Sequence, residues 1–269
     1  AFEIFSDLGF RSLVMEFAPT AATVTKDYRL VTDASGLSEL VNELRQATRV
    51  GLRVIPDGES AVRAGISGLA FSVGRGVARY VAVRPTPVTP SSALASSAAG
   101  SMFDFLDERP PVPPATAPAD PRLTLSDALQ ALKPVLEDPG IEKIGHDLKF
   151  DVIVLGRHGV QLHGLGLDTM LASYLLDATR SGHPLEGTAL EYLGYRALSE
   201  EDLCGRGAKA VSLTSLSPHA ILDYAGELAD LARQLSEVLE PKLQQEQLGE
   251  VYANLERPLI PVLAAIERA

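Results

Sequence analysis

The sequence has 269 residues, of which 46% are hydrophobic, so it can bury one large core or two modest ones. It holds no run of about 18 uncharged apolar residues and lacks the basic-then-apolar order of a signal peptide, so we expect a cytoplasmic protein with no membrane segment. The net charge of -11 argues against a generic nucleic-acid binder, which needs clustered Lys and Arg, but it is compatible with a nuclease whose magnesium site is itself acidic.

The first third of the chain predicts a helix followed by a β-meander. Residues 1–34 are irregular apart from a β-rich patch at 22–31. The segment SGLSELVNELRQA, residues 35–47, has apolar residues at helical spacing after a serine, which predicts a short amphipathic helix. Three apolar runs of strand length follow: 50–55, 66–73 and 77–83. The sequence GRG at 74–76 predicts a hairpin turn between the last two.

Residues 84–122 differ in composition from the segments on either side. They hold nine prolines, from Pro85 to Pro121, and are otherwise rich in Ala and Ser. Such a composition cannot bury enough apolar area to offset the entropy of the chain, so we expect a disordered insertion. Within it, MFDFLDE at 102–108 is an apolar cluster among acids, consistent either with a weak self-contact or with a short docking motif for a partner.

From Leu125 onward, helices and short strands alternate. The helical segments have apolar residues at helical spacing: 125–137, 147–158, 168–178, 185–194, 218–247 and a last one that begins near 248. The strands between them are short apolar runs: 141–145 and 162–167. Pro218 fits the first turn of its helix, where its missing N–H costs nothing. A meander followed by this alternation is typical of an α/β domain with a mixed sheet.

Four segments of this second half occur in the order of a known family. They are KIGHDLKFDVIVLGRHGVQLHGLGLDTMLASYLLDA, ALEYLG, GRGAK and DYAGELAD. Through them the chain resembles the 3'-5' exonuclease domain of bacterial DNA polymerase I, family A, over roughly residues 50–269 with the insertion aside. The resemblance implies an α/β, ribonuclease H-like 3'-5' exonuclease fold with a mixed five-stranded sheet flanked by helices.

The resemblance also implies a division of the chain and a set of partners. Residues 1–34 resemble the linker from a preceding 5'-nuclease domain, 35–247 the exonuclease-like domain with its insertion, and 248–269 the start of the helix leading into a polymerase domain. The implied partners are that polymerase domain in the same polypeptide and, through it, DNA. We expect a monomer with no cofactor in this domain, and Mg²⁺ for the parent polymerase.

Proofreading members of the family carry four metal-binding acids and a tyrosine in three motifs. In motif order, the corresponding positions are Arg53 and Ile55, Asp147 and Asp151, and Tyr224 and Leu228. Only Asp151 retains a ligand, because Asp147 replaces an asparagine and the other three acids are gone. Since unit charges about 4 Å apart interact by about 4 kcal/mol at an effective dielectric near 20, Arg53 would strongly repel a divalent ion. We therefore predict a degenerate, inactive exonuclease domain with a structural role in a family A DNA polymerase.

A shifted set of acids is the main alternative. Four carboxylates for an active, metal-dependent 3'-5' exonuclease could come from Asp57, Glu59, Asp151 and Asp230. Pro56 weighs against this set because it has no N–H for a central strand and indicates that the strand ends there. Asp230 lies about 200° around its helix from Leu228 and so faces away when Leu228 faces the site. A stand-alone RNA-trimming exonuclease of the same fold is a third possibility.

The remaining polar residues have structural explanations. Asp168 is expected to cap the helix that follows it, and His146 and His183 to bond to backbone or solvent rather than to a metal. Glu227 could reach the edge of the site but does not replace a lost ligand. Four cations could touch a DNA strand, although a solvated face explains each of them: Lys149, Arg157, Arg206 and Lys209.

Overall fold

The computed structural model describes residues 18–20, 24–84, 122–207 and 210–269. In chain order, its elements are β1 (Asp27–Val31), α3 (Ala34–Gln46), β2 (Arg49–Pro56), β3 (Ile66–Gly74), β4 (Val77–Ala82), α4 (Leu125–Leu136), β5 (Glu142–Gly145), α5 (Leu148–Arg157), β6 (Leu165–Asp168), α6 (Thr169–Leu176), α7 (Leu185–Leu193), α8 (Glu200–Cys204), η2 (Leu213–Ser215), α9 (Pro218–Gln245), α10 (Gly249–Val251), the π-helical turn η3 (Tyr252–Glu256) and α11 (Arg257–Arg268). None of the helices in these residues is both long and apolar enough to cross a bilayer.

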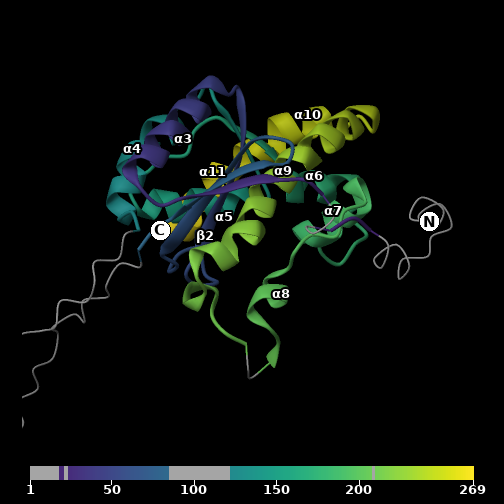
Figure 1. Cartoon of the computed structure of the whole chain (residues 1–269). Helices are drawn as coiled ribbons and strands as arrows, with labels where there is room; N and C mark the ends of the chain where they lie inside the picture. Colours follow the sequence, from purple (N-terminus) through teal and green to yellow (C-terminus); the bar gives the residue numbers. More distant parts are fainter. Residues whose placement is uncertain (1–17, 21–23, 85–121, 208–209) are drawn as a thin grey trace, which may run out of the picture.

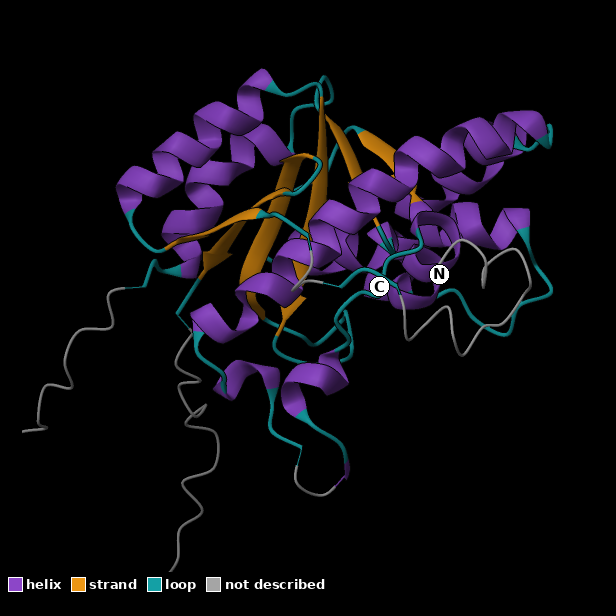
Figure 2. Ribbon diagram, turned by 45° about the vertical axis from the view of Figure 1, so that its right-hand side comes forward, coloured by secondary structure: helices purple, strands orange, loops and turns teal. Residues whose placement is uncertain are grey.

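A single mixed sheet of six strands forms the centre, with helices on both faces (Figures 1 and 2). The strand order is β1-β4-β3-β2-β5-β6. The β2–β3 and β3–β4 pairs are antiparallel, whereas β1–β4, β2–β5 and β5–β6 are parallel. The predicted fold class is therefore confirmed, but the sheet has six strands where five were expected.

The additional strand, β1, comes from the segment that was predicted to be a linker. It pairs in parallel with β4, and Tyr28 lies so close to α9 that a Cβ added at Gly226 would come within 2.5 Å of its ring. Its sequence, DYRLV, alternates polar and apolar residues over its first four positions, although of its five residues only Val31 is buried. Residues 27–31, which lie in the β-rich patch predicted at 22–31, are thus a strand of the sheet.

The two ends of the predicted insertion lie side by side. Val83 forms a parallel bridge with Leu123, and the Arg84 N–H donates to the Leu123 carbonyl at 2.9 Å. Residues 85–121, which include the MFDFLDE motif, lie outside the described residues. Disorder over residues 84–122 stays a prediction.

The strand β2 separates the two halves of the core by the two-residue period of its side chains. Its even-numbered residues are buried against α3, α4 and α5: Val50, Leu52 and Val54. The other face meets α9, where a Cβ added at Gly51 would lie 2.2 Å from the Ala229 carbonyl oxygen. Ile55 is buried among α9 residues, and the same period places Arg53 on that face. The close approach of α9 to β2 therefore requires glycine at position 51.

The end of the chain forms α10, η3 and α11, and α11 packs against α5 and β6. The inward face of α11 buries Ile260 and Ala264. An outward face is apolar as well, and we call it the C-terminal stripe: Val251, Leu255, Leu259, Val262, Leu263 and Ile266. A helix that is apolar on opposite sides is typical of an element covered on both.

Candidate functional site

Facing residues of β2 and α9 form the walls of a cleft of about 620 Å³. The strand contributes Arg53 and Ile55, and the helix contributes Tyr224 and Leu228, which lie on one face because they are four residues apart. Asp147 completes the wall at the start of α5. A smaller hollow of about 310 Å³ shares four of these five residues, all except Ile55. Five of the six positions predicted from the motifs thus meet at one cleft.

Asp147 is the N-cap of α5, and its backbone is left-handed, with φ of 65°. Its side chain accepts a hydrogen bond from the Phe150 N–H at 3.4 Å. Positive φ is uncommon outside glycine, but Asp and Asn adopt it more readily than most residues do. Asp147 therefore serves as a helix cap in a position where the family pattern has asparagine.

Asp151, the sixth position, lies behind the cleft wall and is fully buried. Its Oδ1 accepts a hydrogen bond from the Val54 N–H at 3.0 Å and forms an ion pair with Arg53 Nη1 at 3.5 Å. Its Oδ2 is buried with no hydrogen-bond partner. Burial raises the pKa of this carboxyl to about 7, although the Arg53 charge and the Val54 hydrogen bond act in the opposite direction.

The guanidinium of Arg53 stands in front of Asp151. Besides its ion pair it donates to the His146 carbonyl at 3.0 Å and lies over the Phe150 ring, 4.9 Å from the ring centroid. Only 19% of the side chain is exposed. Arg53 is thus held by an acid, a carbonyl and an aromatic face, all contributed by the β5–α5 segment.

The residues of the cleft do not fit a divalent metal. Mg²⁺ prefers several oxygen ligands, and the buried free Oδ2 of Asp151 is one such atom. The opposite oxygen of the same carboxylate faces a guanidinium, which would repel a cation. Among the described residues, no group of three or more His, Cys, Asp or Glu side chains is placed to hold a metal ion. We therefore derive no metal-dependent step from this cleft.

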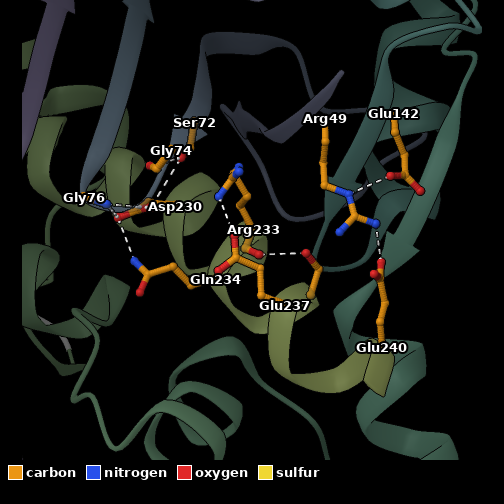
Figure 3. Close-up of polar contacts among 11 residues, drawn as sticks. Arg49, Ser72, Gly74, Gly76, Glu142, Asp230, Arg233, Gln234, Glu237 and Glu240 are labelled. Atoms are coloured by element: carbon orange, nitrogen blue, oxygen red, sulfur yellow. Dashed lines mark hydrogen bonds and ion pairs between the residues drawn. The ribbon is translucent and has the colours of Figure 1, made fainter. Parts of the chain in front are cut away.

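The structure does not assemble the shifted set of acids. Asp57 and Glu59 line the cleft, and Asp57 Oδ1 accepts a hydrogen bond from the Gly65 N–H at 2.5 Å. Asp230 instead lies on another face of α9, where it accepts hydrogen bonds from the Tyr28 hydroxyl at 2.8 Å and from the Gly76 N–H. Figure 3 shows Asp230 directed toward Gly76 and Gln234. In this structure Asp230 therefore bonds to the β3–β4 turn and to β1 and does not line the cleft.

Glu227 does not reach the edge of the site either. It is buried, pairs with Lys26 and accepts a hydrogen bond from the Tyr195 hydroxyl at 2.5 Å. Its other oxygen accepts from the Leu198 N–H at 2.7 Å. Lys26 comes from the segment before β1, so the sequence around α9 could not reveal this partner.

Asp168 caps α6, as predicted, and it also holds the start of α5. It accepts hydrogen bonds from four backbone N–H groups: Asp147 at 3.2 Å, Leu148 at 2.7 Å, Met170 at 3.0 Å and Leu171 at 3.3 Å. His146 contacts the Thr169 hydroxyl and the His183 carbonyl, both at 2.8 Å, and burial lowers its pKa to about 4. His146 therefore bonds to a backbone carbonyl, as expected, and also to a side-chain hydroxyl.

Two acids in the walls of these hollows were not identified from the sequence. Glu200, at the start of α8, lines the larger cleft, and Glu186, in the first turn of α7, lines the smaller one. The run of acids at the start of α8 was a visible signal, but its distance in sequence from β2 concealed its place in the cleft. The walls are consequently more acidic than the motifs indicated.

The cations considered for DNA contact are engaged within the molecule, except Lys209, which lies outside the described residues. Lys149 pairs with Glu267 on α11. Arg157 donates to the carbonyl of Ala64 at 2.6 Å. Arg206 pairs with Glu201 at 2.6 Å in an exposed position.

Comparison with known proteins agrees with this architecture. Similar solved structures include the POL domain of Pol1 from M. smegmatis in complex with DNA primer-template and dNTP (TM-score 0.60, 19% identity, 89% of this chain and 32% of that chain). Another is Brucella melitensis NrnC with bound Mg²⁺ (TM-score 0.58, 19% identity, 91% of this chain and 94% of that chain). At these identities the likeness concerns the fold, which is the ribonuclease H-like fold of 3'-5' exonucleases.

Sequence similarity then places the chain in a family. Residues 115–244 match a family described as 3'-5' exonuclease. The DNA polymerase I of Pseudomonas aeruginosa is 33% identical over 254 residues, 93% of this chain and 25% of that protein. The DNA polymerase I of Rhizobium leguminosarum is 38% identical over 149 residues, 55% of this chain and 15% of that protein. The chain therefore belongs to the 3'-5' exonuclease domains of the DNA polymerase I family, and it spans a quarter or less of the length of these relatives.

Proposed function

We propose that this chain is a non-hydrolytic 3'-5' exonuclease domain that serves as a structural part of a DNA polymerase I in replication and repair synthesis. The observation that carries the proposal is the place of Arg53, whose guanidinium lies 3.5 Å from the buried Asp151 carboxylate. Two-metal hydrolysis needs clustered carboxylates around two cations. Here a fixed positive charge stands beside the one retained acid, and Ile55 and Leu228 supply apolar side chains where relatives have ligands.

The tyrosine of the third motif fits this proposal. In proofreading relatives this tyrosine orients the attacking water, whereas Tyr224 is only 9% exposed and packs with Ile55 and Leu228. Burial raises its pKa. With no metal ligand set beside it, Tyr224 acts as part of the wall that joins α9 to β2.

The C-terminal stripe supports the structural side of the proposal. Its six apolar residues follow one side of α10, η3 and α11, opposite Ile260 and Ala264, which face the domain. Exposed apolar patches of this kind mark protein contacts. We propose that the stripe packs against the polymerase domain of the same polypeptide. That domain would bind DNA and the Mg²⁺ of the polymerase reaction. We also propose that the protein is cytoplasmic, as expected from the sequence.

The decisive experiment is a nuclease assay on the purified chain. A 5'-labelled single strand is incubated with Mg²⁺ or Mn²⁺ beside an active proofreading exonuclease as positive control, and we expect it to stay at full length. The matched variant is Asp151→Ala, which removes the retained ligand position. Shortening that requires metal and is abolished in Asp151→Ala would refute the proposal, whereas shortening that persists in the variant identifies a contaminant.

A gain-of-function variant tests whether the positions were assigned correctly. Arg53→Asp, Ile55→Glu and Leu228→Asp together rebuild three acids around Asp151, and we expect the triple variant to bind Mn²⁺ in electron paramagnetic resonance titrations. The unchanged chain is expected to leave the free Mn²⁺ signal unaltered. Saturable Mn²⁺ binding by the unchanged chain, lost in Asp151→Ala, would contradict the proposed loss of the metal site.

A further inference from the structure

The charge of the cleft is the opposite of what a DNA strand requires. Across the two adjoining hollows the acidic wall residues are Asp57, Glu59, Asp147, Glu186 and Glu200, whereas among the lining residues that the structure describes Arg53 is the lone lysine or arginine. In a two-metal site, bound cations offset such acids. The described residues assemble no cluster able to hold a metal, and of these acids Asp57 and Asp147 accept backbone N–H groups, from Gly65 and Phe150.

The positive charge of Arg53 already interacts with other residues of the protein. Arg53 pairs with Asp151, donates to the His146 carbonyl and lies over Phe150. Affinity for a DNA strand depends on Lys and Arg that are free to contact its phosphates. A guanidinium fixed in this way would have to give up its contacts before it could bind a phosphate.

The aromatic side chains of the cleft are also poorly suited to receive bases. Single strands bind by stacking their bases on exposed aromatic faces. Tyr224 is 9% exposed, and one face of the Phe150 ring is covered by the guanidinium of Arg53. Within the described part of the chain, the cleft thus lacks the free cation and the open stacking surfaces that hold a strand independently of metal.

We infer that this cleft no longer receives the 3' end of a DNA strand, and that its acidic wall excludes the strand. The inference rests on the proposed function and extends it from hydrolysis to binding. In a polymerase that carries this domain, the primer end would then have no second binding site here, and it would stay at or dissociate from the polymerase site.

The test measures binding of a fluorescein-labelled oligothymidylate of about 12 nucleotides by anisotropy at about 50 mM salt, with Ca²⁺ in place of Mg²⁺. We expect no saturable binding by the unchanged chain. The variant Glu59→Gln, Glu186→Gln, Glu200→Gln removes three acids of the wall and leaves Arg53 in place. It should bind at least about 10-fold more tightly, with an affinity that falls as salt rises.

A matched control distinguishes the effect of the acids in the cleft from the effect of a changed net charge. Glu39→Gln, Glu246→Gln, Glu250→Gln changes the net charge equally at exposed positions that do not line either hollow. This control should bind no better than the unchanged chain. An equal gain in both triple variants, or no gain in the cleft variant, would overturn the acidic wall as the cause.

Binding by the unchanged chain would overturn the inference if it is saturable and weakened by Tyr224→Ala or Arg53→Met. Such binding without shortening of the strand would leave the proposed function intact. Shortening of the strand in the nuclease assay would instead contradict the proposed function itself, so the two failures can be told apart.

Discussion

Asp151 and Asp168 are two buried carboxylates near the start of α5, and the protein satisfies them in different ways. Asp168 accepts four backbone N–H groups from the first turns of α5 and α6. Asp151 accepts one backbone N–H, faces Arg53 and leaves Oδ2 without a partner. Burial raises the pKa of both carboxyls, to about 6 for Asp168 and to about 7 for Asp151.

The difference shows that burial of an acid does not by itself indicate a structural role or an active site. Asp168 has a structural role: helix N-termini need acceptors for their free N–H groups, and Asp168 supplies them at the start of both α5 and α6. Oδ2 of Asp151 has no hydrogen-bond donor, so the surroundings of this carboxylate stabilise its charged form less well. Three predictions test this contrast.

The largest effect is expected from Asp168→Ala. The change leaves four backbone N–H groups at two helix starts without their acceptor, which should lower the free energy of unfolding by about 3 to 5 kcal/mol. Urea denaturation measures it. The control Asp168→Asn keeps one acceptor oxygen and should lose less than half as much. Equal losses in both variants would show that charge, rather than capping, makes Asp168 important.

The second prediction concerns pH. Because the folded pKa of Asp151 is raised from 3.8 to about 7, the folded state keeps a proton that the unfolded state has lost. Stability should therefore fall as pH rises through this window, by about 3 kcal/mol from Asp151 between pH 5 and 8. Asp151→Asn should remove about 3 kcal/mol of this fall, whereas the opposed contributions of Asp168, whose pKa is raised to about 6, and His146, whose pKa is lowered to about 4, remain in both proteins. A fall of unchanged size in Asp151→Asn would assign it to another group.

The smallest effect is expected from Arg53→Met, which removes the cation beside Asp151 while retaining apolar bulk. At pH 8 the unfolding free energy should fall by about 2 kcal/mol, because the remaining carboxylate is buried without its counter-charge. In an Asp151→Asn background the same change should cost less than about 1 kcal/mol. Additive losses in this double-mutant cycle would show that Arg53 acts mainly through His146 and Phe150.

Much of the site could be predicted because its signals are local. The two-residue period of β2 puts Arg53 and Ile55 on the same face, and the four-residue spacing of Tyr224 and Leu228 puts them on one side of α9. The cap at Asp168 also depends on its own neighbours in sequence. The segment order of the second half sufficed to identify the family and the α/β fold.

What the sequence alone determined is therefore most of the helices and strands, the family and the motif positions, since each depends on residues a few positions apart. Tertiary structure decided which partners those residues meet. The strand β1 exists because β4 offers it an edge about 50 residues away, and Glu227 and Asp230 turn from the cleft because Lys26 and Tyr28 reach them from that segment. The acidity of the cleft likewise depends on helices far from β2 in sequence. It could not be predicted, because non-local contacts leave no periodic pattern in the sequence.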